Sequence, residues 1–505
     1  MNQIYNKSVV VIGGGIGGLF SGAILAKEGL KVTVLEQNAT VGGGLQSFTR
    51  FGEVFDTGMH MIGGMQKGGS TRKLCEYLGI FDKIEVKDVD RDTIDHIYFA
   101  EDKKNYKTAQ GKVNFVNAMS EHFPAEKENL IAYIEALYKI ANESDLLYLR
   151  PTNSNSILPK FSEEASISVN DFIAKYITNK RLRKVLAYLS PFYGGVKDTT
   201  PAYIHALISV LYINGPSRFA GGSYLLAETL KEYIIKLGGE VIVSDGVKHV
   251  SSKDRNITSV VTNKGKVYTA DYYICAIHPC TFITLLDDPT IFPKAYRNRL
   301  NQIPNTYSAF TVYFKFKKDS FKYINHTSYY VGKYDDVWEF SNPNHKWPIG
   351  FIYTTPPEIN QGEYSTKMII VAPMLWEETK KWENTTVGKR GEEYKRWKEE
   401  NVEKIIEKLT EIYPKFRDCI ENVNAASPLT IRDYYGVKEG SMYGYLKDCN
   451  NMTLSGIPVV TKVKNLFLTG QNCGIHGFCG VTLTCINTCE AILGHNYILN
   501  RINKL

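Results

Sequence analysis

Several glycines and one carboxylate near the start of the chain have the types and spacing that bind a dinucleotide. Gly13, Gly15 and Gly18 form a G-x-G-x-x-G motif, and Glu36 follows 18 residues after the last of them. These glycines permit a tight turn, a close approach of the backbone to a pyrophosphate, and close packing of a helix on a strand. A carboxylate at this spacing accepts hydrogen bonds from ribose hydroxyls and disfavours a 2′-phosphate, so NADP is not expected. The predicted contacts of this turn are Gly13, Gly15, Ile16, Gly17 and Gly18.

Two strands and a helix must position these residues. Ser8–Ile12 is a short apolar run rich in β-branched residues, which is typical of a strand buried on both faces. A helical segment reaches about Glu28, and a strand over Lys31–Leu35 ends directly before Glu36. The helix N-terminus offers unpaired N–H groups and the positive end of its dipole to a phosphate. The motif therefore has the context of a dinucleotide site, and a glycine turn without a ligand is the less favoured interpretation.

The segment after Glu36 favours FAD over NAD. The chain continues through Gly42–Gly44 and residues 52–60 as a glycine-rich loop and an apolar turn. A plain NAD domain would enter another helix at this point. Glycine backbone can lie close against a flat, extended ligand, as an FAD molecule is.

A second segment near the C-terminus points to the same cofactor. A strand over Lys464–Leu468 leads into Thr469–Asn472, and Gly480 is expected to open a helix over Val481–Leu493. The N-terminus of that helix can stabilise the negative charge of a reduced flavin. Both ends of the chain are therefore predicted to meet at one FAD.

Three longer motifs extend this interpretation over nearly the whole chain. They are FDTGMHMIGGM at Phe55–Met65, the run Thr200–Val241, and NLFLTGQN at Asn465–Asn472. On these residues the chain resembles the superfamily of FAD-dependent phytoene desaturases, carotenoid isomerases and retinol saturases, and the retinol saturase branch in particular. The resemblance implies an α/β fold: a Rossmann-type FAD-binding domain with an inserted α+β substrate domain, part helical and part mostly antiparallel sheet. It also implies an oxidoreductase that acts on carbon–carbon double bonds of an apolar isoprenoid or polyene lipid, as saturase or desaturase, through flavin N5.

The resemblance carries over to individual cofactor contacts. In such proteins the glycine doublet after the acid contacts the phosphates, which here indicates Gly42 and Gly43. The backbone of Val247 would touch the adenine. Asn472 stands where the family usually has Asp, and its amide can still bond the ribityl hydroxyls. The remaining predicted cofactor contacts are Gln37, Gly44, Gly470, Gln471 and Val481.

The FAD-binding domain is predicted to be discontinuous, with residues 1–85, 215–290 and 425–505. Residues 86–214 and 291–424 are then two substrate-binding insertions, the first mainly helical and the second with strand-like alternation. The second ends in an amphipathic helix whose apolar face is expected to pack on the core. We expect the insertions to form a long apolar cavity that ends at the flavin. The expected helices and strands of the insertions are Val113–His122, Glu126–Ala141, Val169–Tyr176, Tyr307–Phe316, Ile349–Thr354, Lys367–Val371 and Glu392–Tyr413.

Few side chains are candidates for catalysis beside the flavin. His60 and His476 lie in loops next to the predicted flavin contacts and are the candidate catalytic residues. His278, Tyr193 and Cys473 are further candidates near the ring. A single histidine elsewhere, such as His205 or His249, is more often a hydrogen-bonded structural residue. Because the chain has only one glycine fingerprint, no nicotinamide site is expected, and electrons would pass to or from an external donor or acceptor.

Composition narrows the cellular setting. Nine scattered cysteines without a CxxC pair favour reduced thiols and no metal site, even though four lie between residues 473 and 489. No run approaches the roughly 20 apolar residues that span a bilayer, and no apolar leader precedes the first strand, so a cytoplasmic protein is expected. No motif suggests nucleic-acid binding. The net charge of +7 is compatible with a peripheral contact to an anionic membrane, although a basic run is also typical of a solvated helix face. The run in question is Lys180, Arg181, Arg183 and Lys184.

Three other functions remain open at this stage. A redox-neutral isomerase would use reduced FAD to change double-bond geometry without net electron transfer. A flavin amine oxidase would share the architecture, but it needs polar or aromatic-cage residues at the ring, which no motif marks. A flavin-binding protein without catalysis is the least favoured, because the cofactor motifs are intact.

Overall fold

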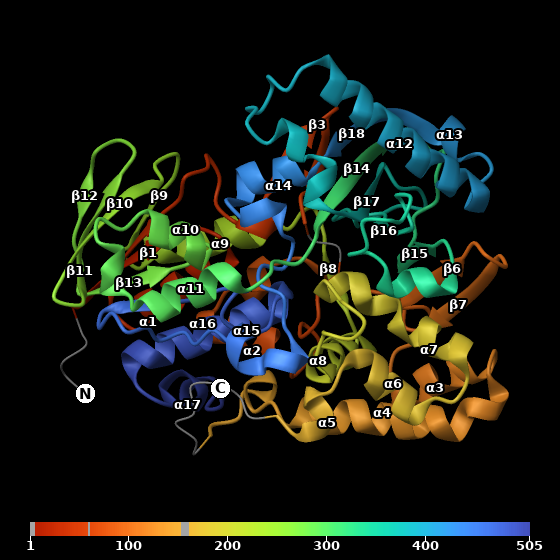
Figure 1. Ribbon diagram of the computed structural model, residues 1–505, viewed down its shortest axis with the longest axis horizontal. Helices are drawn as coiled ribbons and strands as arrows, with labels where there is room; N and C mark the ends of the chain where they lie inside the picture. The colour runs from red at the N-terminus through yellow and green to blue at the C-terminus, as the bar shows by residue number, and fades with distance from the viewer. Residues whose placement is uncertain (1–5, 59–60, 153–160) are drawn as a thin grey trace.

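The structure is a computed structural model that describes residues 6–58, 61–152 and 161–505 (Figure 1). A five-stranded parallel sheet forms its dinucleotide-binding part and draws on widely separated segments of the chain. The strand order, from one edge to the other, is β19 (Leu466–Leu468), β13 (Tyr272–Cys275), β1 (Ser8–Ile12), β2 (Lys31–Leu35) and β9 (Glu240–Ile242).

The alternation of side chains along β1 explains why this strand is apolar throughout. Val9 and Val11 belong to the core that packs against helices α1, α9 and α16. Val10 and Ile12 point to the opposite face, into a core shared with a small antiparallel sheet and two helices. The helices on the first face are α1 (Ile16–Lys27), α9 (Tyr224–Lys236) and α16 (Gly477–Leu493). The strands and helices on the second face are β10 (Val247–Lys253), β11 (Asn256–Thr262), β12 (Val267–Tyr268), α10 (Pro279–Thr284) and α11 (Lys294–Gln302).

A seven-stranded sheet forms the second large layer. It is antiparallel except where β15 runs parallel to β6. Its order is β18 (Ile420–Ala426), β14 (Ser308–Phe316), β17 (Lys367–Met374), β16 (Gly350–Thr354), β15 (Thr327–Val331), β6 (Asp95–Phe99) and β7 (Lys104–Thr108).

The long helix α12 (Glu392–Ile412) covers one face of this sheet, at the upper right of Figure 1. Its Ile405 and Leu409 share a hydrophobic core with Phe310 of β14 and Ile370 of β17. The amphipathic face predicted from the sequence is therefore part of the core.

Helices of the first insertion form a separate group at the lower right of Figure 1. The helix α8 is buried on almost every side, and α4 packs along it. No helix in the described residues is long and apolar enough to cross a membrane. The group consists of α3 (Lys112–Ser120), α4 (Lys127–Asn142), α5 (Glu163–Ser166), α6 (Val169–Tyr176), α7 (Lys180–Leu186) and α8 (Ala202–Ile213).

The basic run on α7 makes contacts within the protein. Lys184 Nζ lies 2.7 Å from Asp335 Oδ1, and Arg181 Nη1 lies 3.2 Å from Asp102 Oδ2. Arg183 donates to the carbonyl of Ile177. These contacts leave fewer free charges for lipid headgroups than the sequence suggested, and a membrane contact at this run stays a prediction.

The α/β fold class is confirmed, with two corrections to its elements. The first insertion is not helical alone, because it supplies β5, β6 and β7; the charged turn between β6 and β7 hid a hairpin whose strands complete the large sheet. The stretch after Gly44 is not a loop and a turn but the hairpin β3–β4, which docks on that sheet. The domain limits given above stay a prediction. The other elements outside the two large sheets are β3 (Ser47–Arg50), β4 (Glu53–Asp56), α2 (Ser70–Leu78), β5 (Val86–Asp88), β8 (Ser217–Phe219), α13 (Phe416–Cys419), α14 (Pro428–Tyr435), α15 (Met452–Ser455) and α17 (Tyr497–Ile502).

Packing under α12 predicts a large loss of stability for Ile370→Ala. Ile370 is fully buried and pairs with Val312 on one side and Tyr353 on the other. The cavity left behind should lower the free energy of unfolding by about 2–5 kcal/mol, measured by urea denaturation. Ile235→Ala, at a position 49% exposed on α9, is the matched control and should change it far less. Equal losses in the two variants would contradict this packing.

Candidate functional site: a dinucleotide cradle beside an apolar wall

The glycine turn between β1 and α1 is as tight as its sequence requires. Gly13 has a φ of +106°, and a Cβ atom there would come within 2.8 Å of Ile277. A Cβ atom at Gly18 would lie 2.0 Å from the carbonyl oxygen of Gly13, and one at Gly17 would lie 3.1 Å from Gly470 Cα. Only glycine therefore lets α1 start so close to the strand ends.

The glycines predicted to contact the phosphates lie together against this turn. The Gly42 N–H donates to the carbonyl of Gly14 at 2.8 Å, and residues 15 and 42 form an isolated parallel bridge. Gly43, with a φ of +55°, lies beside Gly15, while the Cβ positions of Gly44 and Gly470 meet nothing within 4 Å. The arrangement leaves a bare backbone cradle in which a pyrophosphate could lie.

Glu36, directly after β2, accepts hydrogen bonds from the backbone at the cradle. One carboxylate oxygen accepts from the Gly14 N–H at 2.7 Å and the other from the Asn38 N–H at 2.8 Å. Burial raises the pKa of Glu36, and the two backbone donors act against that rise. Its oxygens keep lone pairs for the ribose hydroxyls predicted from the sequence.

The structure brings the two adenine-side candidates to the same place. The Asp245 N–H donates to the carbonyl of Glu36 at 3.0 Å, so the start of β10 lies beside the end of β2. A Cβ atom at Gly246 would come 2.7 Å from Gln37 Cβ, and Val247 follows directly. Gln37 and Val247 thus flank the carboxylate.

The helix at the C-terminal side of the site begins earlier than predicted. It starts at Gly477, with His476 as its N-cap, and not at Gly480. The unpaired N–H groups at its start therefore belong to residues 476–479, and Val481 lies in the second turn. Gly480 is a glycine for another reason: a Cβ there would come 2.4 Å from the carbonyl oxygen of Ile475, which belongs to the entering loop. The predicted start of this helix is therefore wrong by three residues, while the cofactor contact expected at Val481 stays a prediction.

The loop before this helix holds the other predicted contacts. Gly470, with a φ of +90°, starts it next to Gly17, and Gln471 and Asn472 follow. Asn472 is buried, and its Oδ1 accepts from the Tyr445 N–H at 3.1 Å. This bond fixes the amide and leaves its NH₂ group to meet a ligand.

Lys447 is a buried cation beside this loop that sequence analysis missed. Its Nζ lies 3.5 Å from the Asn472 carbonyl and 3.3 Å from that of Ser455. Burial lowers the pKa of Lys447 to about 8. A lysine in an otherwise unremarkable segment carries no sequence signal, because only the fold brings it to residue 472.

The two candidate catalytic histidines have different outcomes. His60 lies outside the described residues. His476 is 4% exposed, its Nδ1 has no hydrogen-bond partner among the described atoms, and its ring lies 4.9 Å from that of Tyr443. Burial lowers the pKa of His476 to about 3, with Lys447 adding to the effect, so the imidazole is neutral at physiological pH. Burial likewise raises the pKa of the Cys473 thiol to about 12.

The remaining candidate residues form hydrogen bonds within the protein. His278 caps α10, where Nδ1 accepts from the Cys280 N–H and Nε2 lies 3.1 Å from Asn305 Oδ1. The Tyr193 hydroxyl contacts His205 Nδ1 at 3.3 Å within the core of the first insertion. His205 also bonds the hydroxyl of Tyr133 at 2.7 Å, in agreement with its interpretation as a structural histidine.

The cysteines carry no metal site in the described part of the chain. All nine are free, and no group of three or more histidine, cysteine, aspartate or glutamate side chains is placed to hold an ion there.

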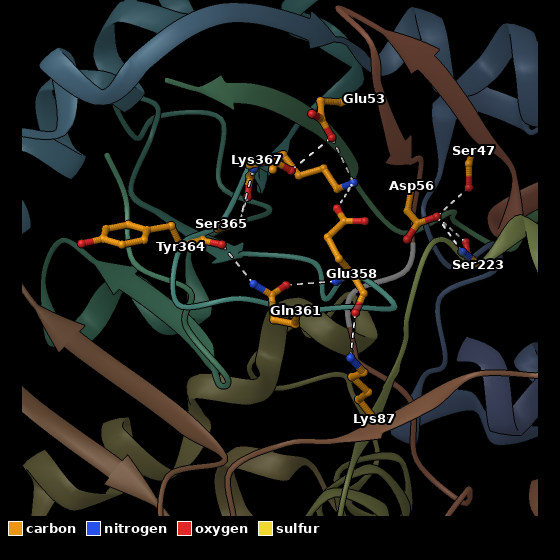
Figure 2. A network of polar contacts seen from close by, with 11 residues as sticks. Ser47, Glu53, Asp56, Lys87, Ser223, Glu358, Gln361, Tyr364, Ser365 and Lys367 are labelled. Carbon is orange, nitrogen blue, oxygen red and sulfur yellow. Dashed lines mark hydrogen bonds and ion pairs between the residues drawn. The ribbon is translucent and has the colours of Figure 1, made fainter. Parts of the chain in front are cut away.

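A polar network ties the β3–β4 hairpin to the large sheet (Figure 2). The Nζ of Lys367, on β17, lies 2.5 Å from Glu358 Oε1 and 3.6 Å from Glu53 Oε2 of the hairpin. At the end of the hairpin, the Asp56 carboxylate accepts from the Ser47 hydroxyl and from both the N–H and the hydroxyl of Ser223. The hairpin follows directly on the cradle glycines. These bonds therefore hold the seven-stranded sheet next to the cradle.

Two cavities lie between the hairpin and the sheet, and they share Asp56 and Thr354. The first, the hairpin cavity, has walls of aliphatic side chains from β16 and β17. The second, the Arg218 cavity, adds residues from before the Gly221–Gly222 turn. The hairpin cavity is lined by Asp56, Thr57, Gly58, Ile352, Thr354, Ile369 and Val371. The Arg218 cavity is lined by Asp56, Met61, Ile62, Arg218, Phe219, Thr354, Pro356 and Pro357.

A third cavity lies inside the first insertion. Among its lining residues are Asp95, Tyr133 and Tyr212. Among the described residues, the third cavity shares no lining residue with the other two, and the long continuous cavity expected from both insertions is not found among the three. Asp95 and Thr327 are register partners on β6 and β15, so their side chains lie on the same face of the large sheet, where Arg218 Nη2 donates to Thr327 Oγ1 at 3.4 Å.

The residues fit the cofactor that the sequence predicts. The cradle is open at Gly44 and Gly470, the buried His476 Nδ1 lacks a partner within the described residues, and a helix N-terminus adjoins them. A parallel sheet with a glycine turn, a carboxylate after its second strand and a returning C-terminal helix defines a dinucleotide-binding protein of the Rossmann type.

Comparison with known proteins identifies the family. The profile described as flavin containing amine oxidoreductase matches residues 16–493, and the chain belongs to this family. The protein is thus an FAD-dependent oxidoreductase.

Individual relatives confirm the superfamily resemblance. The chain is 28% identical to the all-trans-retinol 13,14-reductase of Danio rerio, over 97% of this chain and 86% of that protein. It is 26% identical to the 4,4′-diapolycopene oxygenase of a Methylomonas species, over 54% and 56%. A solved oxidoreductase from Methanosarcina mazei has the same fold, with a TM-score of 0.65 at 16% identity, and covers 96% of this chain and 100% of that one.

The position of Glu36 predicts that Glu36→Arg weakens FAD binding. The substitution would remove the acceptor for the Gly14 N–H. It would also place a cation next to the Gly14 and Asn38 N–H groups, which are hydrogen-bond donors. We expect FAD affinity to fall by about 100-fold, measured by titration of the apoprotein with FAD and by the flavin retained on gel filtration. Glu240→Arg makes the same charge change at an exposed position on β9 and should retain FAD. Full occupancy in the Glu36 variant would refute the assignment.

The buried carboxyl of Asp95, in the third cavity, should make the stability of the protein depend on pH. Burial raises the pKa of Asp95 from 3.8 to about 6, against hydrogen bonds from Tyr188 and Thr108. The folded protein then holds a proton that the unfolded chain has lost, so stability falls as pH rises from about 4 to about 6. Asp95→Asn should remove a component on the order of 2–3 kcal/mol from this dependence. Parallel slopes for the two proteins in thermal melts across this range would contradict it.

Proposed function

We propose that the protein uses FAD to oxidise or reduce a carbon–carbon double bond of an elongated apolar lipid of the isoprenoid or polyene class. The observation that carries the proposal is the aliphatic wall of the hairpin cavity. Ile352, Ile369 and Val371 face Thr57 and Gly58, in the segment that follows the cradle. Such a wall suits a hydrocarbon chain, because it offers contact area and no hydrogen bond.

The relatives support the same substrate class. The names of the similar proteins specify a retinol and a carotenoid, both conjugated hydrocarbons with few polar atoms. A flavin amine oxidase is less well supported, since the hairpin cavity is lined by no aromatic side chain in its described part.

Each part of the site has a role in this proposal. When bound, FAD supplies the two-electron chemistry at the substrate carbon. The glycine cradle and Glu36 would bind its phosphates and ribose, and Asn472 would orient it from the opposite side. The network around Asp56 and Lys367 holds the aliphatic wall in place and keeps water out. His60 and His476 stay the candidate catalytic residues, and the neutral His476 would act as a hydrogen-bonding group and not as an acid.

The electron partner belongs to the proposal as well. The chain has one glycine fingerprint, at residues 13–18, and the proposal assigns it to FAD. We therefore propose that an external donor or acceptor exchanges electrons with the flavin.

An anaerobic single-turnover experiment tests the proposed reaction. The chemically reduced enzyme is mixed with all-trans-retinol, with the fully saturated alcohol as a control, and the oxidised-flavin absorbance is followed while products are identified by mass spectrometry. For a saturase, flavin reoxidation should match the saturated product one to one. A desaturase should instead be reduced by its substrate when mixed in the oxidised form.

The outcomes separate the alternatives. A geometric isomer that forms while the flavin stays reduced would replace the proposal by a redox-neutral isomerase. Reduction of the oxidised enzyme by amines, with no response to polyenes, would replace it by an amine oxidase.

A further inference from the structure

Arg218 is a buried cation without a carboxylate partner. It is 2% exposed, and within the described residues it forms no ion pair within 4.0 Å. Its Nη1 lies 3.3 Å from the carbonyls of Ile324 and Thr355, and Nη2 lies 3.4 Å from Thr327 Oγ1. The Tyr323 hydroxyl is a further polar neighbour of the guanidinium. The Nε of Arg218 has no hydrogen-bond partner among the described atoms. Burying a guanidinium in this way costs free energy, because neutral acceptors replace hydration only in part.

Two acidic groups, Asp56 and Asp95, lie near Arg218 but form no ion pair with it. The Asp56 carboxylate, in the same cavity, receives three hydrogen bonds from Ser47 and Ser223. Asp95 lines the third cavity, where Oδ2 accepts from Thr108 and Tyr188, while its Oδ1 has no hydrogen-bond partner among the described atoms and the carboxylate attracts Arg218 without touching it. The positive charge of Arg218 is therefore not neutralised by direct contact.

The position of Arg218 is fixed relative to the cofactor side. Ser217, the residue before it, bridges Ile62, whose N–H donates to the Ser217 carbonyl at 2.9 Å. The rest of the wall around the guanidinium is apolar, with Met61, Phe219 and Pro357. Because the Arg218 cavity and the hairpin cavity share Asp56 and Thr354, the guanidinium lies at one end of the proposed hydrocarbon site.

We propose that Arg218 binds a carboxylate at the end of the apolar substrate, so that the natural substrate is a polyene or isoprenoid acid. This inference rests on the proposed function and narrows its substrate class. A guanidinium presents parallel N–H donors that match a carboxylate, and such charge-assisted bonds are the strongest available in an apolar cavity. The same ligand would supply a counter-charge in direct contact with the guanidinium.

A purely structural role makes the opposite prediction. If Arg218 served only to bind the carbonyls of Ile324 and Thr355, its loss would destabilise the protein and leave ligand affinity unchanged. If Arg218 instead serves to bind an anionic ligand, its replacement should leave the melting temperature of the ligand-free protein unchanged or raise that temperature.

The test is a binding measurement that requires no turnover. The oxidised FAD-bound enzyme is titrated with all-trans-retinoic acid and with all-trans-retinol, which differ only in the end group, and binding is followed by quenching of tryptophan fluorescence. We expect the acid to bind at least 10-fold more tightly than the alcohol. Arg218→Gln should weaken the acid by about 10-fold to 100-fold and the alcohol by less than about 3-fold. Arg218→Lys, which keeps the charge but loses the parallel donors, should lie between.

Arg390→Gln is the matched control. The Arg390 side chain is also largely buried, at 5% exposed, but it is paired with Asp433 and lines neither cavity. Its replacement should lower the melting temperature and leave acid binding unchanged, the reverse of the pattern expected for Arg218.

The outcomes distinguish this inference from the proposed function. Equal affinity for acid and alcohol, unaffected by Arg218→Gln, would overturn the carboxylate site and leave the polyene site intact. A fall in melting temperature with Arg218→Gln and no change in acid affinity would also overturn it, in favour of the structural role. Failure of both ligands to bind the FAD-loaded enzyme would overturn the proposed function and this inference with it.

Discussion

The close backbone contacts at the glycine turn are the constraint on which the rest of the structure depends. The first helix can start at residue 16 only because no side chain stands between Gly18 and the Gly13 carbonyl. That approach brings Gly17 against Gly470 and Gly15 against Gly43. The cradle, the C-terminal loop and the hairpin after Gly44 all take their positions from it, and the hairpin in turn supports the large sheet through Glu53 and Lys367.

Local patterns predicted the parts of the protein that local physics determines. The strands at Ser8–Ile12 and Lys31–Leu35 and the helix at Val169–Tyr176 have the predicted limits, because β-branched runs and apolar periodicity specify them directly. The glycine motif also identified the cradle, since its chemistry follows from spacing. Gly480 misled the prediction, because a glycine needed for close packing inside a helix has the same appearance as one that starts it.

Features that arise from long-range contacts were beyond the reach of the sequence. Strands β6 and β7 join a sheet whose other strands begin some two hundred residues later, so their own short pattern was too weak to predict them. Arg218 belongs to a motif that was noted for its glycines, yet nothing local distinguishes a buried, unpaired arginine from a surface one. Lys447 and Asp95 are similar: their significance comes from burial, and burial is a property of the whole fold.

The order of strands in the parallel sheet has a consequence for how the protein is made. The central strand β1 leaves the ribosome first, but its neighbour β13 follows more than 250 residues later and the edge strand β19 comes near the end of the chain. A fingerprint complete after 36 residues therefore has β2 beside it at once, β13 only after about half of the chain, and the Gly470 side of its cradle only near the end. Cofactor loading is expected late in biosynthesis, because one side of the cradle is among the last segments to be made.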